Sequence, residues 1–358
     1  MKLKMKKENK NLYKIFLFFI LIFLVIIFTD NTFSESSKSE NSNLYPIISN
    51  NGSIQLYLTE PEKYNFGESI IEKVLIDKIK GATKSITILS FDFDNANLIE
   101  ALLEAAKRGV KIRMICDLNN TPEQALKIFQ SQNWLVYYKS KKLMHHKIII
   151  FDENLIGLGS MNFAVSCMYV NNNDFYLIKN EEIAQMFESY FDYLAYGKNK
   201  EIMQKPKTID DITFYFANSP YYNINDYISS LIDKAGFRIV FAYSTFTNEN
   251  LAKKIIKIIE DKKLFFFGLL EKRNAYSKYS VYSYFLNNNL HIYLDRNDYY
   301  MHHKMMIIDN IVLTGSYAIS DRKNTEKSIE FNDDLSFSFE DKKIADFLVE
   351  YLKSLILR

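Results

Sequence analysis

Two stretches of this sequence are closely similar, and together they decide the fold: MHHKIIIFDENLIGLGSMNF at Met144–Phe163 and MHHKMMIIDNIVLTGSYAIS at Met301–Ser320. Each opens with a His-His-Lys tripeptide, runs through apolar residues to an aspartate, and ends near a Gly-Ser pair. Residues two apart in a strand point to the same face. We therefore expect His145 to share a face with Lys147, and His302 to share one with Lys304. The second histidine of each tripeptide should face the opposite way.

The two stretches belong to a longer internal repeat. Ile76–Asn97 matches Ser229–Asn250, and each copy reads as helix, turn, apolar strand, amphipathic helix and second strand. Apolar strands separated by helices favour a mostly parallel sheet covered on both faces. The prediction is an α/β protein with two tandem domains, at residues 53–204 and 205–358. Each would be a mixed, mostly parallel sheet flanked by helices, and pseudo-two-fold symmetry would relate them.

The pattern also predicts the bounds of the repeated elements. The first strand of each copy is expected at Ser85–Phe91 and Arg238–Ser244. The helix that follows is expected at Asn97–Arg108 and Glu249–Lys262, and the second strand at Lys111–Cys116 and Leu264–Leu270.

A pair of histidines and a pair of lysines suits the cleavage of a phosphodiester. One imidazole can attack phosphorus, while the other protonates the leaving oxygen and then activates water. The reference pKa of histidine, about 6.5, allows either role at neutral pH. The lysines would stabilise the negative charge of the transition state, so the chemistry needs no metal or other cofactor. Further donors to the phosphate are expected from Ser160, Asn162 and Ser316, while Asp152 and Asp309 should anchor the motif loops.

These residues resemble the phospholipase D superfamily, whose signature is H-x-K-x4-D-x6-G-S with an asparagine two residues after the serine. The first copy fits throughout. The second copy has one residue fewer between Asp309 and Gly315, and Ala318 replaces the asparagine.

The resemblance implies two α/β domains with one active site at their interface. An acidic residue after each motif would orient a histidine across that site, and the candidates are Asp174 and either Asp333 or Asp334. In the family the first histidine is more often the nucleophile. The resemblance therefore assigns His145 as the nucleophile and His302 as the acid and base.

The N-terminal region is typical of a segment that directs a protein to or across a membrane. Residues 1–14 carry six lysines and one glutamate, a local charge of +5, so the remaining chain sums to −3 out of a total of +2. Residues 15–29 hold an apolar run of the length of a signal peptide, and residues 30–51 read as a flexible linker. Either an uncleaved anchor or a cleaved signal would place the rest outside the cytoplasm of a bacterium, membrane-bound or secreted.

Several substrates and roles fit these features. A phospholipid is favoured by the N-terminal segment, by the −3 charge of the remaining chain and by tyrosines before the second motif: Tyr293, Tyr299 and Tyr300. A nucleic acid is the alternative, because Lys139, Lys141 and Lys142 precede His145 and could follow a phosphate backbone. Two further hypotheses are that the protein synthesises cardiolipin by phosphatidyl transfer, or that it binds a ligand without turnover. The sequence indicates no oligomeric state.

Overall fold

The structure is a computed structural model that describes residues 45–61, 69–138, 142–320 and 332–356, and residues 46–358 form one compact unit. The predicted membrane segment, most of the linker, Lys139 and Lys141 lie outside the described residues. Within them, no helix combines the length and apolar character needed to cross a bilayer.

The first half of the unit is built on a seven-stranded sheet with the strand order β1-β2-β8-β6-β5-β3-β4. Its elements are β1 (Ile47–Ile48), β2 (Ile54–Leu58), α2 (Ile70–Gly81), β3 (Ser85–Ser90), α3 (Ala96–Lys107), β4 (Lys111–Cys116), α4 (Glu123–Ser131), β5 (Lys147–Phe151), β6 (Leu155–Gly159), α5 (Val165–Tyr169), β7 (Asn171–Asn172), β8 (Asp174–Lys179), α6 (Glu181–Tyr196) and the 3₁₀-helix η2 (Lys200–Met203).

The second half is built on an eight-stranded sheet with the order β13-β12-β11-β15-β16-β17-β10-β9. Its elements are β9 (Lys207–Ile209), β10 (Ile212–Phe216), α7 (Ile224–Asp233), β11 (Arg238–Tyr243), α8 (Glu249–Lys262), β12 (Phe265–Leu270), α9 (Lys272–Ala275), α10 (Tyr282–Asn287), β13 (Ile292–Leu294), β14 (Tyr300–Met301), β15 (Lys304–Ile308), β16 (Ile311–Gly315), β17 (Leu335–Glu340) and α11 (Lys342–Ile356).

Six strands occur in the same order in both sheets. The series β2-β8-β6-β5-β3-β4 of the first corresponds to β10-β17-β16-β15-β11-β12 of the second. The predicted bounds of the repeated strands and helices agree with β3, β4, α3, β11, β12 and α8 to within one residue. Asn95 and Asn248 cap α3 and α8 alike, each accepting from the backbone N–H three residues on, which fixes where both helices begin. The expected domain bounds at residues 204 and 205 fall between η2 and β9, and they stay a prediction.

The mixed sheets flanked by helices are confirmed, but their expected mostly parallel character is wrong. Among the described strands of the two large sheets, the parallel pairs are β3 with β4, β11 with β12 and β12 with β13. The other pairs are antiparallel, including the motif hairpins β5–β6 and β15–β16. A continuous apolar strand indicates that both sheet faces are covered, and such burial does not determine strand direction.

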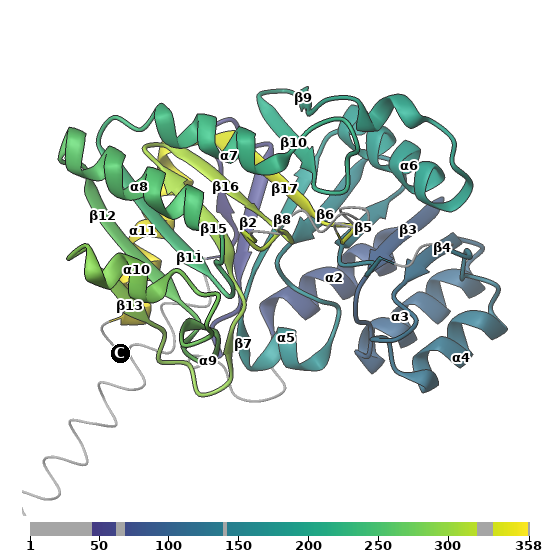
Figure 1. The fold of residues 1–358 in the computed structure, drawn as a ribbon. Helices are drawn as coiled ribbons and strands as arrows, with labels where there is room; N and C mark the ends of the chain where they lie inside the picture. The colour runs from purple at the N-terminus through teal and green to yellow at the C-terminus, as the bar shows by residue number, and fades with distance from the viewer. Residues whose placement is uncertain (1–44, 62–68, 139–141, 321–331, 357–358) are drawn as a thin grey trace, which may run out of the picture. The chain divides into compact units, whose positions relative to one another are not determined.

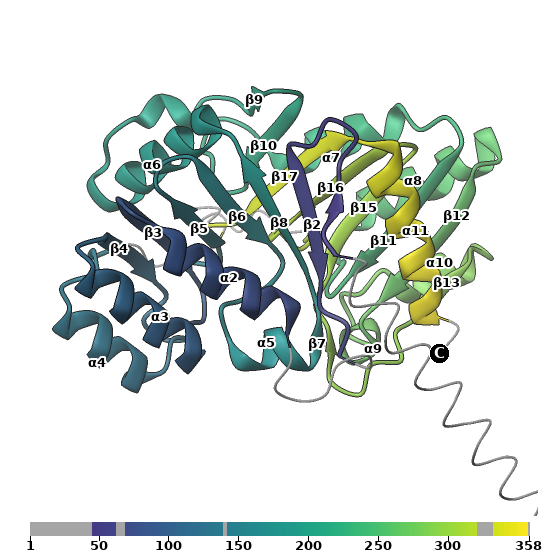
Figure 2. The ribbon, with the colours of Figure 1, turned by 180° about the vertical axis from the view of Figure 1, so that it is seen from behind.

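Helices cover both faces of the second sheet, with α7, α8 and α10 on one side and α11 on the other (Figures 1 and 2). An aromatic core joins the two halves where their sheets approach. Tyr176 of β8 meets Phe337 of β17 with ring centroids 5.3 Å apart, and Phe187 of α6 meets Phe214 of β10 at 5.2 Å. Both motif hairpins therefore end close to one shared interface.

Candidate active site

Each motif segment is hydrogen-bonded to the opposite half of the molecule. The His145 backbone N–H donates to the carbonyl of Asp333 at 3.0 Å, next to a parallel bridge between Met144 and Asp333. In the second half, β14 pairs with β7 in parallel, and the His302 N–H donates to the carbonyl of Asn172 at 2.8 Å. These reciprocal pairings bring the two motifs together at one site between the halves.

The two motif lysines are buried and their charges act on one another. Lys147 and Lys304 are 1% and 3% exposed, and each Nζ donates to the carbonyl of its own motif histidine, at 2.7 and 2.9 Å. Burial lowers the pKa of Lys147 to about 7, and the charge of Lys304 acts in the same direction. Burial also lowers the pKa of Lys304 to about 8, although Asp334 and Asp174 oppose the change. An anion bound between the lysines would relieve their repulsion.

The two motif histidines have different partners across the interface. His145 Nδ1 lies 2.6 Å from Asp334 Oδ1, whereas His302 Nδ1 lies 2.9 Å from Asn173 Oδ1. Of the two candidates after the second motif, Asp334 contacts a motif histidine and Asp333 does not. The candidate Asp174 is wrong by one residue, because Asn173 is the partner of His302. The register explains it: Ser160 N–H donates to the carbonyl of Asp174 and Ser316 N–H to that of Leu335, so Asn173 corresponds to Asp334.

Asp174 faces the protein core, where it meets His303, the second histidine of the other motif. It accepts from His303 at 2.8 Å and from Thr314 at 2.6 Å, with all three side chains buried. Burial acts to raise the pKa of Asp174, but these hydrogen bonds leave it below its ordinary value. His146 is also fully buried, and its Nε2 contacts the Tyr190 hydroxyl at 2.8 Å. The strand alternation therefore placed both second histidines correctly, away from the site.

The predicted phosphate donors are buried beside the site, and the two serines hold carboxylates. Ser160 donates to Asp174 at 2.7 Å, and Ser316 donates to Asp334 at 2.8 Å. Asn162 is 8% exposed, and its Oδ1 has no hydrogen-bond partner. Ser316 therefore reaches the site through the carboxylate that holds His145.

Asp152 and Asp309 lie at the far ends of β5 and β15, away from the histidines. Asp152 accepts from the backbone N–H groups of residues 83–85, and Asp309 accepts from those of residues 236–238. Both have positive φ, 50° and 54°, as the turns that follow the motif strands require. They anchor the entry to β3 and β11, which is the loop-anchoring role the sequence suggested.

Asp333 is buried beside Asp334 but does not contact His145 through its side chain. Its Oδ1 accepts from the Asn218 amide, and its Oδ2 has no hydrogen-bond partner. Burial, together with the charge of Asp334, raises the pKa of Asp333 to about 8. The neighbouring Asp334 has a lowered pKa, because the charge and hydrogen bond of His145 outweigh its burial. At neutral pH the pair thus carries a single negative charge, on Asp334.

The walls of the site differ between the halves. Phe91, directly after β3, packs edge-on against the His145 ring at 4.8 Å and lies 5.0 Å from Lys147 Nζ. The Tyr300 ring lies 5.7 Å from the His302 ring, and its hydroxyl accepts from the Asn274 amide. Of the three tyrosines singled out in the sequence, Tyr300 is the one that approaches a motif histidine. Phe91 was missed, although its place after the strand that pairs with β5 was a usable signal.

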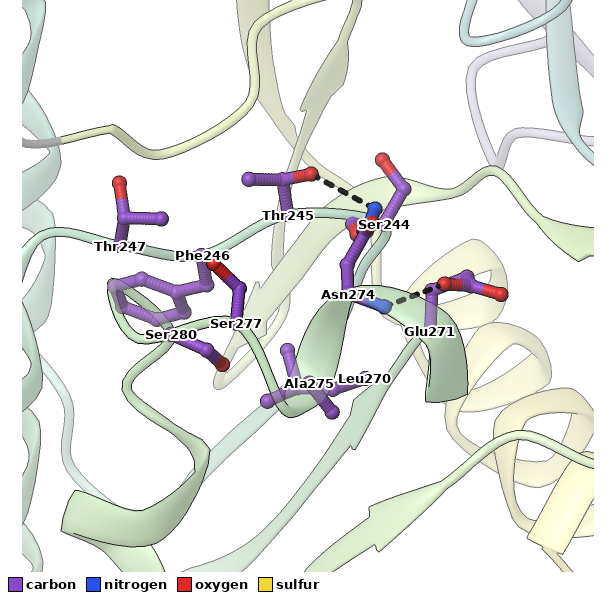
Figure 3. Close-up of a pocket in the computed structure, with 10 residues that line it drawn as sticks. All are labelled: Ser244, Thr245, Phe246, Thr247, Leu270, Glu271, Asn274, Ala275, Ser277 and Ser280. Atoms are coloured by element: carbon purple, nitrogen blue, oxygen red, sulfur yellow. Dashed lines mark hydrogen bonds between the residues drawn. The ribbon is translucent and has the colours of Figure 1, made fainter.

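Two cavities open next to the motifs. The larger, of ≈ 480 Å³, is lined by Cys116, Asp117, Leu118, Asn119, Gln130, Leu135, Val136, Tyr137, Tyr138, Lys142 and Leu143. It adjoins the first motif, because Asp117 Oδ2 accepts from the Met144 N–H at 3.1 Å. The smaller, of ≈ 100 Å³, is rich in hydroxyl groups and includes Ser244, Thr245 and Asn274 (Figure 3). It adjoins the second motif, because the Ser244 N–H donates to the carbonyl of His303 at 2.8 Å.

Comparisons with known proteins follow the same two segments. The family described as "Cardiolipin synthase, PLD-like domain" matches residues 75–195 and 228–356. A protein named phospholipase D from Rickettsia prowazekii is 27% identical over 118 residues, 32% of this chain and 58% of that protein. A mitochondrial cardiolipin hydrolase from Chlamydomonas reinhardtii is 26% identical over 122 residues, 33% of this chain and 55% of that protein. The chain thus spans little more than half the length of these relatives.

Among solved structures, the fold is similar to that of a phosphatidylserine synthase from Haemophilus influenzae, with a TM-score of 0.62 at 13% identity. That match covers 90% of each chain, so it includes both halves. The family match covers more than half of this chain and contains both motifs. The protein therefore belongs to the phospholipase D superfamily, with two PLD-like domain segments in one chain.

Proposed function

We propose that this protein is a phospholipase D-type phosphodiesterase that hydrolyses a phospholipid phosphodiester through a phosphohistidine intermediate. The observation that carries the proposal is the convergence of both histidines and both buried lysines at one site between the halves. The lysines neutralise the two non-bridging oxygens, the histidines perform the proton and phosphoryl transfers, and no metal takes part in any of these steps.

The cavity beside the first motif favours a lipid. Leu118, Tyr137 and Leu143 are 54%, 73% and 38% exposed, and all three line this cavity. Leu143 lies two residues before His145, so an acyl or glycerol group bound there would place its phosphate near the histidine. Exposed apolar groups gathered around a concave site commonly mark a binding surface for an apolar ligand. The predicted N-terminal membrane segment would keep the protein at a lipid surface.

A nuclease of the same superfamily is the second candidate, because Lys142 lines the same cavity. A lysine there could contact a nucleic-acid backbone. The other two lysines of that run, which would extend the contact, lie outside the described residues.

One assay separates these candidates. The full chain, purified in detergent with excess EDTA, is incubated with vesicles of phosphatidylcholine, phosphatidylglycerol and cardiolipin and, in parallel, with single- and double-stranded DNA. We expect phosphatidic acid from the vesicles, and no product from His145→Ala or His302→Ala. Degraded DNA beside intact lipid would replace the lipid proposal by the nuclease, and complete loss with EDTA would sink the metal-free mechanism.

A matched pair of variants tests the cavity. Tyr137→Ser should lower activity on vesicles several-fold and leave the cleavage of soluble bis(4-nitrophenyl) phosphate unchanged, because it removes apolar surface without touching the histidines. The control is Tyr279→Ser, at a tyrosine that is 65% exposed and does not line this cavity. Equal effects of the two substitutions on vesicles would contradict a lipid-binding role for the cavity.

A further inference from the structure

We infer that the histidine roles are the reverse of those the family resemblance suggests: His302 attacks phosphorus and His145 donates the proton, with Asn173 and Asp334 as the positioning residues that set these roles. The inference rests on the proposed function and assigns its two chemical steps to particular residues.

The amide of Asn173 is held in one orientation. Its Nδ2 donates to the carbonyl of Cys167 at 2.8 Å and to that of Asn171 at 3.3 Å. Its Oδ1 must therefore face His302, and an amide oxygen only accepts. Nδ1 of His302 is consequently the donor, and the neutral ring carries its lone pair on Nε2. A neutral imidazole with a free Nε2 lone pair is the form that a nucleophile needs.

The carboxylate of Asp334 has the opposite effect on His145. The short contact of 2.6 Å is of the kind made by ionised partners, and Ser316 holds the same oxygen from the other side. A negative charge at this distance favours the imidazolium, in which Nε2 also bears a proton. Of the two motif histidines, His145 is therefore the one better able to hold the proton that the acid must donate.

The surrounding charges increase the difference. Burial lowers the pKa of His302 well below its ordinary value, and the charges of Lys304, Lys147, His145 and His303 act in the same direction. Burial, Lys147 and Lys304 also leave the pKa of His145 below its ordinary value, but there Asp334 opposes the change through its charge and its hydrogen bond, which His302 lacks. Tyr300 faces His302 with its ring, while Phe91 faces His145. Of the two motif rings, His145 is the one that is paired with a negative charge.

The steps then balance. The His302 Nε2 lone pair forms the P–N bond as the bond from phosphorus to the leaving oxygen breaks. The electron pair leaves with that oxygen, which takes the proton from His145 Nε2. Water then attacks phosphorus while neutral His145 accepts its proton, and the P–N electron pair returns to His302. A carboxylate beside the nucleophile would also stabilise the cationic phosphoimidazole that the nucleophile becomes. The acid, however, needs its proton before substrate binds, and of the two motif histidines only His145 contacts Asp334.

The test uses the full chain and bis(4-nitrophenyl) phosphate, whose leaving group departs with little help from an acid. His145→Asn should still release about one equivalent of nitrophenol in a burst and then stall, because the base for the second step is missing. Mass spectrometry after an alkaline quench should find the nitrophenylphosphoryl group on residue 302. His302→Asn should give no burst. A burst in His302→Asn, with the adduct on residue 145, would overturn the inference while leaving the proposed function intact. If the wild-type protein cleaved neither this diester nor any lipid, the proposed function would fall, and the inference with it.

The positioning residues have their own readout. Asn173→Asp gives His302 a negative partner, so the acidic limb of the kcat/KM profile should move to higher pH, and below the displaced limb kcat/KM should fall about tenfold per pH unit. Asp334→Asn should slow an alkyl leaving group at least tenfold more than nitrophenol, because it weakens the acid. An acidic limb that does not move in Asn173→Asp would contradict its role. An aspartate at position 173 cannot donate to the carbonyls of Cys167 and Asn171. If Asn173→Asp does not fold for this reason, the position of the phosphoryl adduct found by mass spectrometry decides the test alone.

Discussion

At the scale of single residues, two side chains of the same type differ in protonation because their surroundings in the site differ. Asp333 and Asp334 are adjacent in sequence, yet one has a carboxylate oxygen without a partner and the other faces a histidine and a serine. Their pKa values move in opposite directions for this reason. The same contrast distinguishes His145 from His302. For the carboxylates, the hydrogen-bond partner determines which of the two carries a charge, and for the histidines only His145 has a partner that favours its charged form.

The raised pKa of Asp333 predicts a pH-dependent stability. Its value of about 8 lies above that of the unfolded chain, about 4, so the folded state holds a proton that the unfolded state has lost. Its contribution is fully present below pH 4 and is lost as pH rises to about 8. Asp333→Asn keeps an acceptor for Asn218 and stays neutral. Its free energy of unfolding should therefore exceed that of the wild type increasingly from pH 5 to pH 8, by up to about 1 kcal/mol per pH unit.

Urea titrations at several pH values measure this difference. The control is Asp211→Asn, at an exposed aspartate in the turn between β9 and β10, where the difference from wild type should stay flat. Parallel stability curves for wild type and Asp333→Asn across this range would contradict the raised pKa.

At the scale of elements, each motif hairpin is fastened at two ends by different means. At the catalytic end, Gly159 and Gly315 allow close approach to β8 and β17, since an added Cβ would overlap the carbonyl oxygens of Asp174 and Leu335. At the far end, Asp152 and Asp309 hold the turns that lead into β3 and β11. The hairpins are therefore rigid supports for the histidine segments.

Removing one far anchor should cost stability without affecting the chemistry. Asp152→Ala leaves the backbone N–H groups of Thr83, Lys84 and Ser85 without their shared acceptor, a loss of about 2 kcal/mol after allowance for the exposed turn. Urea unfolding measures the loss, and kcat below the transition should match that of the wild type. Glu153→Ala, the exposed neighbour in the same turn, is the control. A large fall in kcat with unchanged stability would instead mean that Asp152 acts at the phosphate.

Much of the element scale could be predicted from the sequence, but the direction of most strand pairs and the register of β8 could not. The apolar periodicity located β3, β4, α3 and their counterparts, and the two-residue alternation separated His145 from His146. The histidine partners depend on how β8 lies against β6, and a slip of one residue moves every side chain of a strand to the other face. No pattern within Asn171–Asp174 specifies that register. The sequence therefore favours the acidic Asp174, whereas the structure places Asn173 against His302.

At the scale of the whole molecule, the two halves share a core as well as a site. Phe337 of the second half is fully buried, with its ring 5.3 Å from Tyr176 of the first half and 6.0 Å from Phe214. The aromatic contacts and the reciprocal strand pairings join the halves on both sides of the histidines. We therefore expect the halves to unfold as one cooperative unit.

Phe337→Ala tests this expectation through a distant probe. Trp134, the single tryptophan, is buried in the first half, so its fluorescence reports on unfolding there. The substitution in the second half should lower the unfolding midpoint seen by Trp134 and by circular dichroism equally, with a loss of about 3 to 4 kcal/mol. Phe265→Ala, at a phenylalanine that is 49% exposed, is the control. A tryptophan transition that stays in place while circular dichroism shifts would mean that the halves unfold separately.

The reciprocal pairing of the motif segments also constrains how this chain can recombine. The partner of His302 is encoded in the first half, and the partner of His145 in the second. A chimera that imports residues 46–204 from a relative keeps its own His302 but receives a foreign residue at position 173. An aspartate or glutamate arriving there would alter the chemistry of the histidine that was not exchanged. The chemistry of the site thus depends on the combination of halves, because each half supplies the hydrogen-bond partner of the other half's histidine.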